Sequence, residues 1–369
     1  MWDFHALLID GAIITCLLYL IILIFFYWGW KRVFSYEPKG IDSTDTMISI
    51  VVACKNEQET ILSLIACVAQ QSYPNYELIL VNDHSTDSTR NVIKNAQKTL
   101  SNIVLIDASG QGKKNALKEG ILSSKSNLIV TTDADCMPSY HWIEAIVTYQ
   151  NRYPSDLILC PVGLSNKNSL FERLQALEFS SLVGAAAGSA GAGMPILCNG
   201  ANLAFEKKMW LKSQRDLHEK EQSGDDMFFL ESVKKQGGKI RFLKSEAAFV
   251  KTKPPRTLKE FLYQRRRWAG KSKIYTDWQI ILTALVVLSI SIFGLAFLVM
   301  SYFDPIYLIG YASMFIFKYS IDTRFLYLVR RFFQLDNIWI YSLILSFIYP
   351  FYIVFVALSS LVFKPKRWK

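Results

Sequence analysis

The 369-residue sequence is poor in the residues that build zinc sites and disulfide frameworks. It contains only four histidines and six cysteines, and no two cysteines form a CxxC pair. This scarcity argues against a zinc site with the usual ligand spacing and against a disulfide-stapled scaffold. We therefore expect the cysteines to be reduced and partly buried.

The glycine-rich phosphate-binding motifs are missing as well. The chain has no GxxxxGKS or GxxxxGKT segment, and no GxGxxG follows its first apolar strand-like run. These absences argue against a P-loop kinase and against a dinucleotide-dependent dehydrogenase. Any phosphate group must then be held by a metal ion and by side chains.

Apolar side chains and positive charge dominate what is present. Hydrophobic residues make up 51% of the chain, and 41 Lys and Arg outnumber 31 Asp and Glu, which gives a net charge of +10. This apolar content exceeds what one soluble core usually needs. Together the two features favour an integral membrane protein with a cationic cytoplasmic side and a lipid bilayer as partner. They disfavour a nucleic-acid-binding protein.

The amino-terminal residues 7–30 form an apolar run that is long enough to span a bilayer. A cleaved signal peptide begins with basic residues, whereas this chain begins with Asp3 and no cation, so we expect residues 1–31 to be an uncleaved anchor. Lys31 and Arg32 follow the run. The positive-inside rule then places the amino terminus outside and the next domain in the cytoplasm, at a bacterial inner or plasma membrane.

A second apolar block covers residues 279–363. Its first and last runs, 280–300 and 338–363, are predicted to span the membrane. The block therefore predicts two or three carboxy-terminal spans, depending on the run between them.

The middle run, 306–329, carries three charged residues, Lys318, Asp322 and Arg324. Lys318 and Asp322 are four residues apart, so they can pair on one helical face. Because charge is costly in a membrane, this run either packs against other helices or lies along the interface. Three spans, which hydropathy favours, would put the basic tail 364–369 outside, and two would put it inside.

Residues 46–256 alternate short apolar runs with stretches of helical pattern. This alternation is typical of a doubly wound α/β domain with a mostly parallel sheet. Such sheets bind ligands where loops leave the carboxyl ends of the strands. Polar residues gather at three of these ends: Lys55-Asn56-Glu57, Asn82-Asp83-His84 and Asp133-Ala134-Asp135.

Asp133 and Asp135 follow the fourth apolar run of this domain. Mg²⁺ and Mn²⁺ take oxygen ligands and bridge substrate phosphates, so two carboxylates suit them. A DxD pair alone also caps turns, and its place at the strand end is what favours a metal. Gly110 to Lys114 adds a flexible turn and two cations before a predicted helix, where the helix dipole favours an anion.

Asp225 and Asp226 form an acidic pair that is also compatible with an ordinary helix start. A hydroxyl acceptor is a poor nucleophile, so a transferase needs a carboxylate within hydrogen-bond reach to take its proton. Asn199-Gly200 precedes an apolar run, and its glycine permits either close approach of a sugar or a plain turn.

Residues 257–273 follow Pro254-Pro255 and are predicted to form an amphipathic interfacial helix. Gln264, Arg267 and Trp268 share one of its faces with Lys271. An indole can cover an acceptor sugar or lipid headgroup, and an arginine can neutralise a diphosphate. A basic amphipathic helix resting on anionic lipid is the compatible alternative.

Ser180 to Gly193 is dense in small residues. It is too short and too weakly apolar to predict a membrane span. Its glycines predict a loop that is either mobile, with a gating role, or closely packed.

Seven segments occur in one order between residues 48 and 273: VVACKNE, ELILVNDHSTD, GKKNAL, TTDADC, CNGANLAF, SGDD and QRRRW. In this order they resemble the family 2 inverting glycosyltransferases with a GT-A (Rossmann-like) fold. The last segment, Gln264-x-x-Arg267-Trp268, is similar to the membrane-embedded branch, which includes ceramide glucosyltransferases and the processive synthases of cellulose, chitin and hyaluronan. The resemblance implies a cytoplasmic GT-A domain flanked by transmembrane helices.

The resemblance also implies ligands and residue roles. The donor is a nucleotide-diphosphate sugar, with UDP expected, and the cofactor is Mg²⁺ or Mn²⁺. Asp226 is the expected catalytic base, with Asp225 where the family commonly has Glu. The other implied sites are nucleotide-sugar binding by Glu57, Asp83, Lys113, Asp133, Gln264, Arg267 and Trp268, metal binding by Asp133 and Asp135, and acceptor binding by Asn199, Gly200 and Trp268.

The acceptor follows from the small number of spans. Three or four spans look too few to enclose a polymer-conducting pore, so we expect one hexose or N-acetylhexosamine to move to a membrane lipid or lipid-linked acceptor. An oligomer or a partner subunit could build a pore, and a processive polysaccharide synthase is therefore the alternative. A noncatalytic scaffold would be expected to have lost the carboxylates that this sequence keeps. A nucleotidyltransferase would release pyrophosphate.

Overall fold

The computed structural model describes residues 2–40, 45–165, 168–216 and 225–362. The chain divides into two compact units. We call Arg32–Ser165 with Leu197–Lys253 the sheet unit, and Met1–Lys31, Asn166–Ile196 and Pro254–Pro365 the helical unit. Residues 168–196, which fall within the predicted 46–256 domain, therefore cluster with the helical unit. The predicted basic tail, 364–369, lies outside the described residues.

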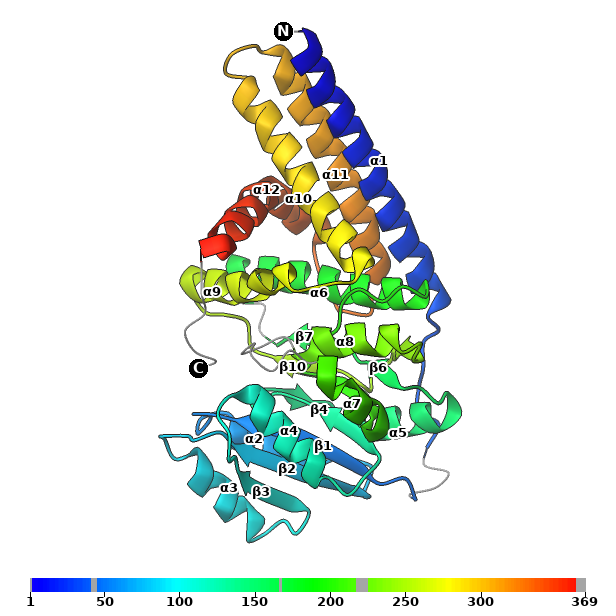
Figure 1. Cartoon of the computed structure of the whole chain (residues 1–369), viewed down its shortest axis with the longest axis vertical. Helices are drawn as coiled ribbons and strands as arrows, with labels where there is room; N and C mark the ends of the chain where they lie inside the picture. The colour runs from blue at the N-terminus through cyan, green and yellow to red at the C-terminus, as the bar shows by residue number, and fades with distance from the viewer. Residues whose placement is uncertain (1, 41–44, 166–167, 217–224, 363–369) are drawn as a thin grey trace. The chain divides into compact units, whose positions relative to one another are not determined.

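Within the described residues, the sheet unit is built on a seven-stranded sheet with the order β3-β2-β1-β4-β8-β6-β9. Figure 1 labels four of its neighbouring strands, β3, β2, β1 and β4. All adjacent pairs are parallel except those of β8, which runs antiparallel to β4 and β6. The expected α/β fold with a mostly parallel sheet is confirmed. The strands are β1 (Ile48–Cys54), β2 (Tyr76–Asn82), β3 (Ile103–Asp107), β4 (Leu128–Thr131), β6 (Leu157–Leu159), β8 (Leu203–Glu206) and β9 (Ile240–Phe242).

Strand β1 is buried along its whole length, as its mostly apolar sequence predicts. A smaller sheet has the order β5-β10-β7. Its strands are β5 (Met137–Pro138), β10 (Val250–Thr252) and β7 (Val162–Leu164). In the small sheet, β5, which follows Asp133 and Asp135 in the sequence, pairs with β10, which precedes the carboxy-terminal boundary of the sheet unit.

Helices follow the strands as the alternating pattern predicts. One contact shows how closely they pack: a Cβ added to Gly120 would lie 2.5 Å from Val51 and 2.9 Å from Val81. Glycine at this position therefore allows α4 to lie directly on β1 and β2. The helices of the unit are α2 (Ile61–Ala69), α3 (Thr89–Gln97), α4 (Lys113–Ser123), α5 (Trp142–Arg152), α7 (Lys207–Ser213) and α8 (Asp225–Lys235), with a 3₁₀ turn at Gln214–Asp216.

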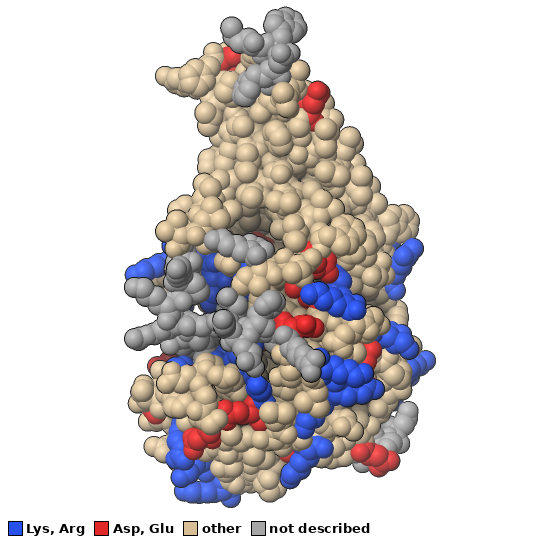
Figure 2. All heavy atoms as spheres, viewed as in Figure 1, with Lys and Arg blue, Asp and Glu red and all other residues tan. Residues whose placement is uncertain are grey.

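The helical unit contains long apolar helices. Among the described residues, three helical segments are long and apolar enough to cross a membrane: His5–Arg32, Trp278–Met300 and Ile338–Val362. Large apolar side chains are exposed along them, and Figure 2 shows few charged side chains on this part of the surface. The helices of the unit are α1 (Trp2–Arg32), α6 (Leu170–Gly191), α9 (Leu258–Ala269), α10 (Trp278–Met300), α11 (Ile306–Val329) and α12 (Ile338–Val362), with a 3₁₀ turn at Gly270–Lys273.

Helix α11 is as long as its neighbours but contains the three charged residues noted above, and it is not one of the three apolar segments. Lys318 is buried and pairs with Asp322, as the four-residue spacing predicts. The Tyr19 hydroxyl on α1 donates to Asp322. Helix α11 therefore packs against other helices, the first of the two options that the sequence left open.

The small-residue segment Ser180–Gly193 is not a loop. Most of it is the second half of α6, which ends at Gly191. A Cβ at Gly29 of α1 would lie 1.7 Å from the carbonyl oxygen of Gly188, so the two backbones touch. The prediction of a loop is wrong because the small residues serve helix crossing, while close packing is confirmed.

Candidate active site

The loops after β1 and β2 are bound together by hydrogen bonds between side chains and backbone. Asn56 accepts from the Thr86 N–H at 2.9 Å, and the Asn56 N–H donates to the Ser85 hydroxyl at 3.1 Å. Asn56 and His84 both have positive φ, 53° and 52°, a conformation that asparagine and histidine tolerate better than most residues. The two loops thus form one hydrogen-bonded rim at the carboxyl edge of the sheet.

Asp83 lies at the centre of this rim and is fully buried. Its carboxylate contacts the Lys55 ammonium at 3.2 Å and accepts from the Gly112 N–H at 3.0 Å. Nδ1 of His84 lies 3.2 Å from the same carboxylate. Gly112 has φ 96°, which glycine adopts without strain and which aims its N–H at Asp83. Asp83 therefore joins the loops after β1, β2 and β3.

Glu57 was predicted to contact the donor, and the structure gives its carboxylate a local partner. The side chain is buried, and Oε2 accepts from the Thr60 hydroxyl at 2.7 Å. The Glu57 N–H donates to the Thr89 hydroxyl at 2.7 Å. These contacts make Glu57 part of the framework of the rim.

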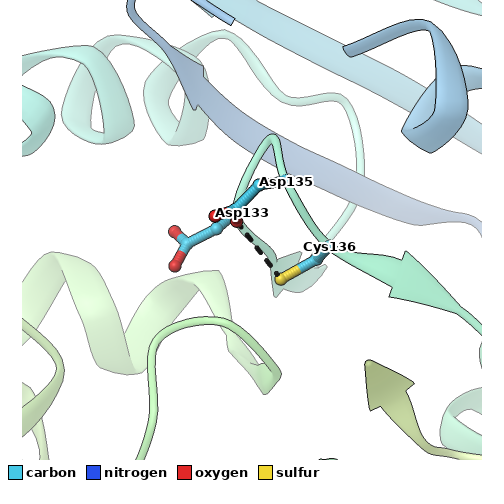
Figure 3. Close-up of side chains that lie close together, drawn as sticks. All are labelled: Asp133, Asp135 and Cys136. Carbon is cyan, nitrogen blue, oxygen red and sulfur yellow. Dashed lines mark hydrogen bonds between the residues drawn. The ribbon is translucent and has the colours of Figure 1, made fainter. Parts of the chain in front are cut away.

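Asp133, Asp135 and Cys136 form an acidic group after β4 (Figure 3). Their ligand atoms all lie within 4.8 Å of one another. Burial and the two nearby carboxylates raise the pKa of the Cys136 thiol well above its usual value, so it stays protonated, with Asp135 3.8 Å from its sulfur. A hard divalent cation takes oxygen ligands. Asp133 and Asp135 thus fit Mg²⁺ or Mn²⁺, and Cys136 does not.

Two adjacent lysines at the start of α4 each meet a different acidic group. Lys113 pairs with Asp133, and Lys114 lies 3.4 Å from Asp225. The sequence pointed to Lys113 but missed the role of Lys114, although the double lysine was visible. The amino terminus of α4 therefore links the acidic group after β4 to the first turn of α8.

Asp226 stands in the first turn of α8 and is held by backbone groups. One carboxylate oxygen accepts from the Gly200 N–H at 3.0 Å, and the other accepts from the Met227 N–H at 2.9 Å. The Gly200 carbonyl accepts from the hydroxyl of Thr131, the last residue of β4, at 3.0 Å. The structure thus brings Asp226, Gly200 and the end of β4 together, although they are far apart in the sequence.

A pocket lies beside this carboxylate. Polar lining residues include Lys114, Thr131 and the acidic pair, and Phe205, Trp210 and Phe229 supply apolar walls. Asn199 does not line it, and its side chain accepts from the Ala201 N–H at 3.0 Å, which stabilises the turn before β8. Gly200 and Asn199 were both expected to bind the acceptor. In the structure, Gly200 lies next to Asp226, and Asn199 stabilises the turn.

The remaining predicted residues, Gln264, Arg267 and Trp268, lie on α9 of the helical unit. A capping box at Thr257 begins this helix, close to the predicted start. The sequence missed Arg265, which is buried and contacts both Gln264 and Trp268. The predicted helix therefore exists. Its most buried cationic residue is Arg265, which does not belong to the predicted face with Gln264, Arg267 and Trp268.

Comparisons with known proteins connect these two units to one family. The profile described as "Glycosyl transferase family 2" matches residues 49–205. The chain is 28% identical over 167 residues to a poly-beta-1,6-N-acetyl-D-glucosamine synthase from Staphylococcus aureus, which is 44% of this chain and 40% of that protein. It is 29% identical over 142 residues to the synthase of the same name from Staphylococcus epidermidis, which is 37% of this chain and 34% of that protein. The chain thus spans well under half the length of these relatives.

The fold has a solved counterpart. A mannosyltransferase from Pyrobaculum calidifontis, in complex with GDP-Man and Mn²⁺, has a TM-score of 0.58 and 16% sequence identity, covering 96% of this chain and 99% of that one. This likeness supports the GT-A-like α/β fold. The profile described as "Glycosyl transferase family group 2" matches residues 128–361, well over half of the chain, and this protein therefore belongs to that glycosyltransferase family.

Proposed function

We propose that this protein is a metal-dependent inverting glycosyltransferase that moves a sugar from a nucleotide-diphosphate donor to a hydroxyl acceptor. The observation that carries the proposal is the placement of Asp226. Its carboxylate is fixed by the Gly200 N–H at 3.0 Å, and the Gly200 carbonyl is bonded to the end of β4, two residues before Asp133. The Asp226 carboxylate is thus linked through Gly200 to the end of β4, and Asp133, which is able to hold a cation, follows that strand end.

Asp226 acts as the general base. It accepts the proton of the acceptor hydroxyl as that oxygen attacks the anomeric carbon and the bond to the donor's phosphate oxygen breaks. One base is enough for this single displacement, which inverts the configuration of the anomeric carbon. The two backbone N–H bonds support the role because they fix the direction of the carboxylate without neutralising it.

The leaving nucleotide diphosphate develops negative charge. A bound Mg²⁺ or Mn²⁺ would neutralise part of that charge, and Asp133 and Asp135 are the residues that would hold it. Lys113, which pairs with Asp133, is the nearest candidate for direct phosphate contact. We assign the nucleoside to the rim around Asp83, with UDP as the expected nucleotide. Roles for Gln264, Arg267 and Trp268 in binding rest on the sequence resemblance.

The acceptor that we propose is a growing polysaccharide, and the donated sugar is N-acetylglucosamine. The names of the relatives support this assignment, which was the alternative in the sequence analysis. A lipid or lipid-linked acceptor remains the second candidate. It is favoured by the three apolar segments found in the described residues, which supply a membrane-facing site more readily than a pore.

We also propose that the protein resides in a membrane with its sheet unit in the cytoplasm. The three apolar segments support membrane residence. Lys31 and Arg32, directly after the apolar run of α1, support the orientation.

The test uses the full chain in detergent with Mn²⁺ or Mg²⁺, a panel of UDP-sugars and a total membrane lipid extract. UDP release and product mass are followed together. A ladder of N-acetylhexosamine masses is the expected result, and one added sugar on a lipid would favour the second candidate. Release of pyrophosphate, or silence with every donor, would contradict the proposed function.

A further inference from the structure

An ion pair is buried in the helical unit, away from the residues assigned above. Glu178 of α6 and Arg265 of α9 form a salt bridge, and each side chain is only 5% exposed. The Tyr352 hydroxyl of α12 donates to the other oxygen of Glu178 at 3.1 Å. Three helices thus meet at one carboxylate.

The same arginine contacts two residues of the Gln264-x-x-Arg267-Trp268 motif. Nη1 of Arg265 donates to Oε1 of Gln264 at 3.1 Å. The guanidinium carbon lies 4.3 Å from the ring centroid of Trp268 and 4.7 Å from that of Phe261. One planar group therefore binds a carboxylate, orients an amide and covers one face of an indole.

This set of contacts suits arginine alone. A buried ion pair gains little net stability, since desolvation of both charges offsets their attraction. Lysine could replace the charge, but its ammonium cannot lie flat against an indole while reaching both Glu178 and Gln264. The contacts of Arg265 therefore suit a role in orienting Gln264 and Trp268 better than a role in stability.

We propose that Arg265, anchored by Glu178, is a positioning residue that fixes Gln264 and Trp268 for their ligands. Because Oε1 of Gln264 is engaged, the amide presents its NH₂ group as a donor for an anionic oxygen. Because Arg265 covers one face of the Trp268 ring, the indole offers its other face to a sugar. The ligand side of this inference rests on the proposed function, and the positioning side does not.

Fluorine NMR of the full chain in detergent tests the positioning directly. The nine tryptophans are replaced biosynthetically by fluorotryptophan, and Trp268→Phe identifies the Trp268 signal. Arg265→Lys and Glu178→Gln are expected to shift or broaden that signal. The matched control is Arg266→Lys, because Arg266 is the neighbouring arginine and stacks on Phe355 at 4.9 Å. An unchanged signal in Arg265→Lys, or an equal change in the control, would overturn the proposal.

A second readout separates positioning from stability. Arg265→Lys is expected to lower the transfer rate by about 10- to 100-fold, the usual cost of a misplaced binding group. Its thermal unfolding midpoint should stay close to that of Arg266→Lys. A loss of activity that only follows a loss of stability would make Arg265 structural and refute the inference. If the wild-type chain transfers no sugar, the proposed function fails, while the fluorine spectra still decide the positioning.

Discussion

Carboxylates in the sheet unit and in the helical unit have different surroundings. In the sheet unit, Asp133 and Asp226 are partly exposed on loops and a helix start at the strand ends, and backbone N–H groups or lysines contact them. In the helical unit, Glu178 and Asp322 each meet one cation and one tyrosine inside packed helices.

The difference follows from solvation. A partly exposed carboxylate can exchange a lysine for a metal ion or a substrate at low cost, because water and mobile cations are close. A charge among apolar helices must keep its partner, since an unpaired buried charge is very costly. The partly exposed carboxylates of Asp133 and Asp226 are therefore suited to ligands, and those of Glu178 and Asp322 are suited to holding their neighbours in place. Substitutions of Asp226, Asp322 and Asp135 test this division, and a pair of glycine substitutions tests how closely the helices pack.

The largest effect is expected from Asp226→Asn. The amide keeps the shape of the side chain but cannot take a proton, so sugar transfer should fall by about 100- to 10,000-fold. Binding of UDP, measured by calorimetry, should change little. Asp225→Asn, which removes the negative charge that faces Lys114 at 3.4 Å, serves as the control and should cost much less. Turnover of the Asp226→Asn variant near the wild-type rate would remove Asp226 as the base.

Asp322→Asn should have the next largest effect, on stability. The substitution leaves Lys318 buried without its counter-ion, and the free energy of unfolding should drop by about 3–5 kcal/mol. Denaturing-detergent titration in mixed micelles measures the loss. The double variant Lys318→Met with Asp322→Leu removes both charges and should recover most of the stability. An Asp322→Asn variant as stable as the wild type would contradict the claim that a charge in the helical unit must keep its partner.

Asp135→Ala should weaken metal-dependent nucleotide binding by about 10- to 100-fold. This is the loss of metal affinity that follows when residues around a metal site are substituted. Calorimetry with UDP and Mn²⁺ measures the change, and removing the metal with a chelator should weaken the wild type to a similar level. Asp156→Asn is the control, because Asp156 accepts from the Lys239 N–H outside the acidic group. Equal Mn²⁺-dependent binding by wild type and Asp135→Ala would argue against the metal role.

The smallest effect comes from two glycines of the helical unit. Gly29→Ala places a Cβ 1.7 Å from the Gly188 carbonyl oxygen, and relief of this overlap should cost about 1–3 kcal/mol. Gly294→Ala meets no atom within 4 Å and should stabilise its helix by about 0.5–1 kcal/mol. The two variants are compared by the same detergent titration. Similar stabilities would mean that α1 and α6 are not in close contact.

The sequence predicted the sheet unit better than the helical unit, for physical reasons. In a parallel sheet, strand ends lie along one edge, so Asp83 and Asp133 could be located from apolar runs alone. The role proposed for Asp226 came from the family resemblance, because no spacing rule links it to Gly200. Contact between Glu57 and the donor stays a prediction, and the hydrogen bond from the Thr60 hydroxyl to its carboxylate could not be read from the sequence.

Most helices of the helical unit were predicted from the length of their apolar runs, and α9 from helical spacing, but the contacts between helices were not predicted. The four-residue spacing was sufficient to predict the pairing of Lys318 with Asp322, because both lie on one helix. Arg265 and Glu178 lie on different helices, 87 residues apart, and no local pattern connects them. The small residues before Gly193 were predicted as a loop because sequence alone does not show that another helix packs against them.

A single displacement assisted by one base inverts the anomeric carbon, so the configuration of the product distinguishes this mechanism from others. The full chain is supplied with a UDP-sugar of known α configuration, and proton NMR coupling at the anomeric carbon of the transferred sugar is measured. A β-linked product is expected. An α-linked product would require two displacements or a different mechanism, and would contradict the role given to Asp226.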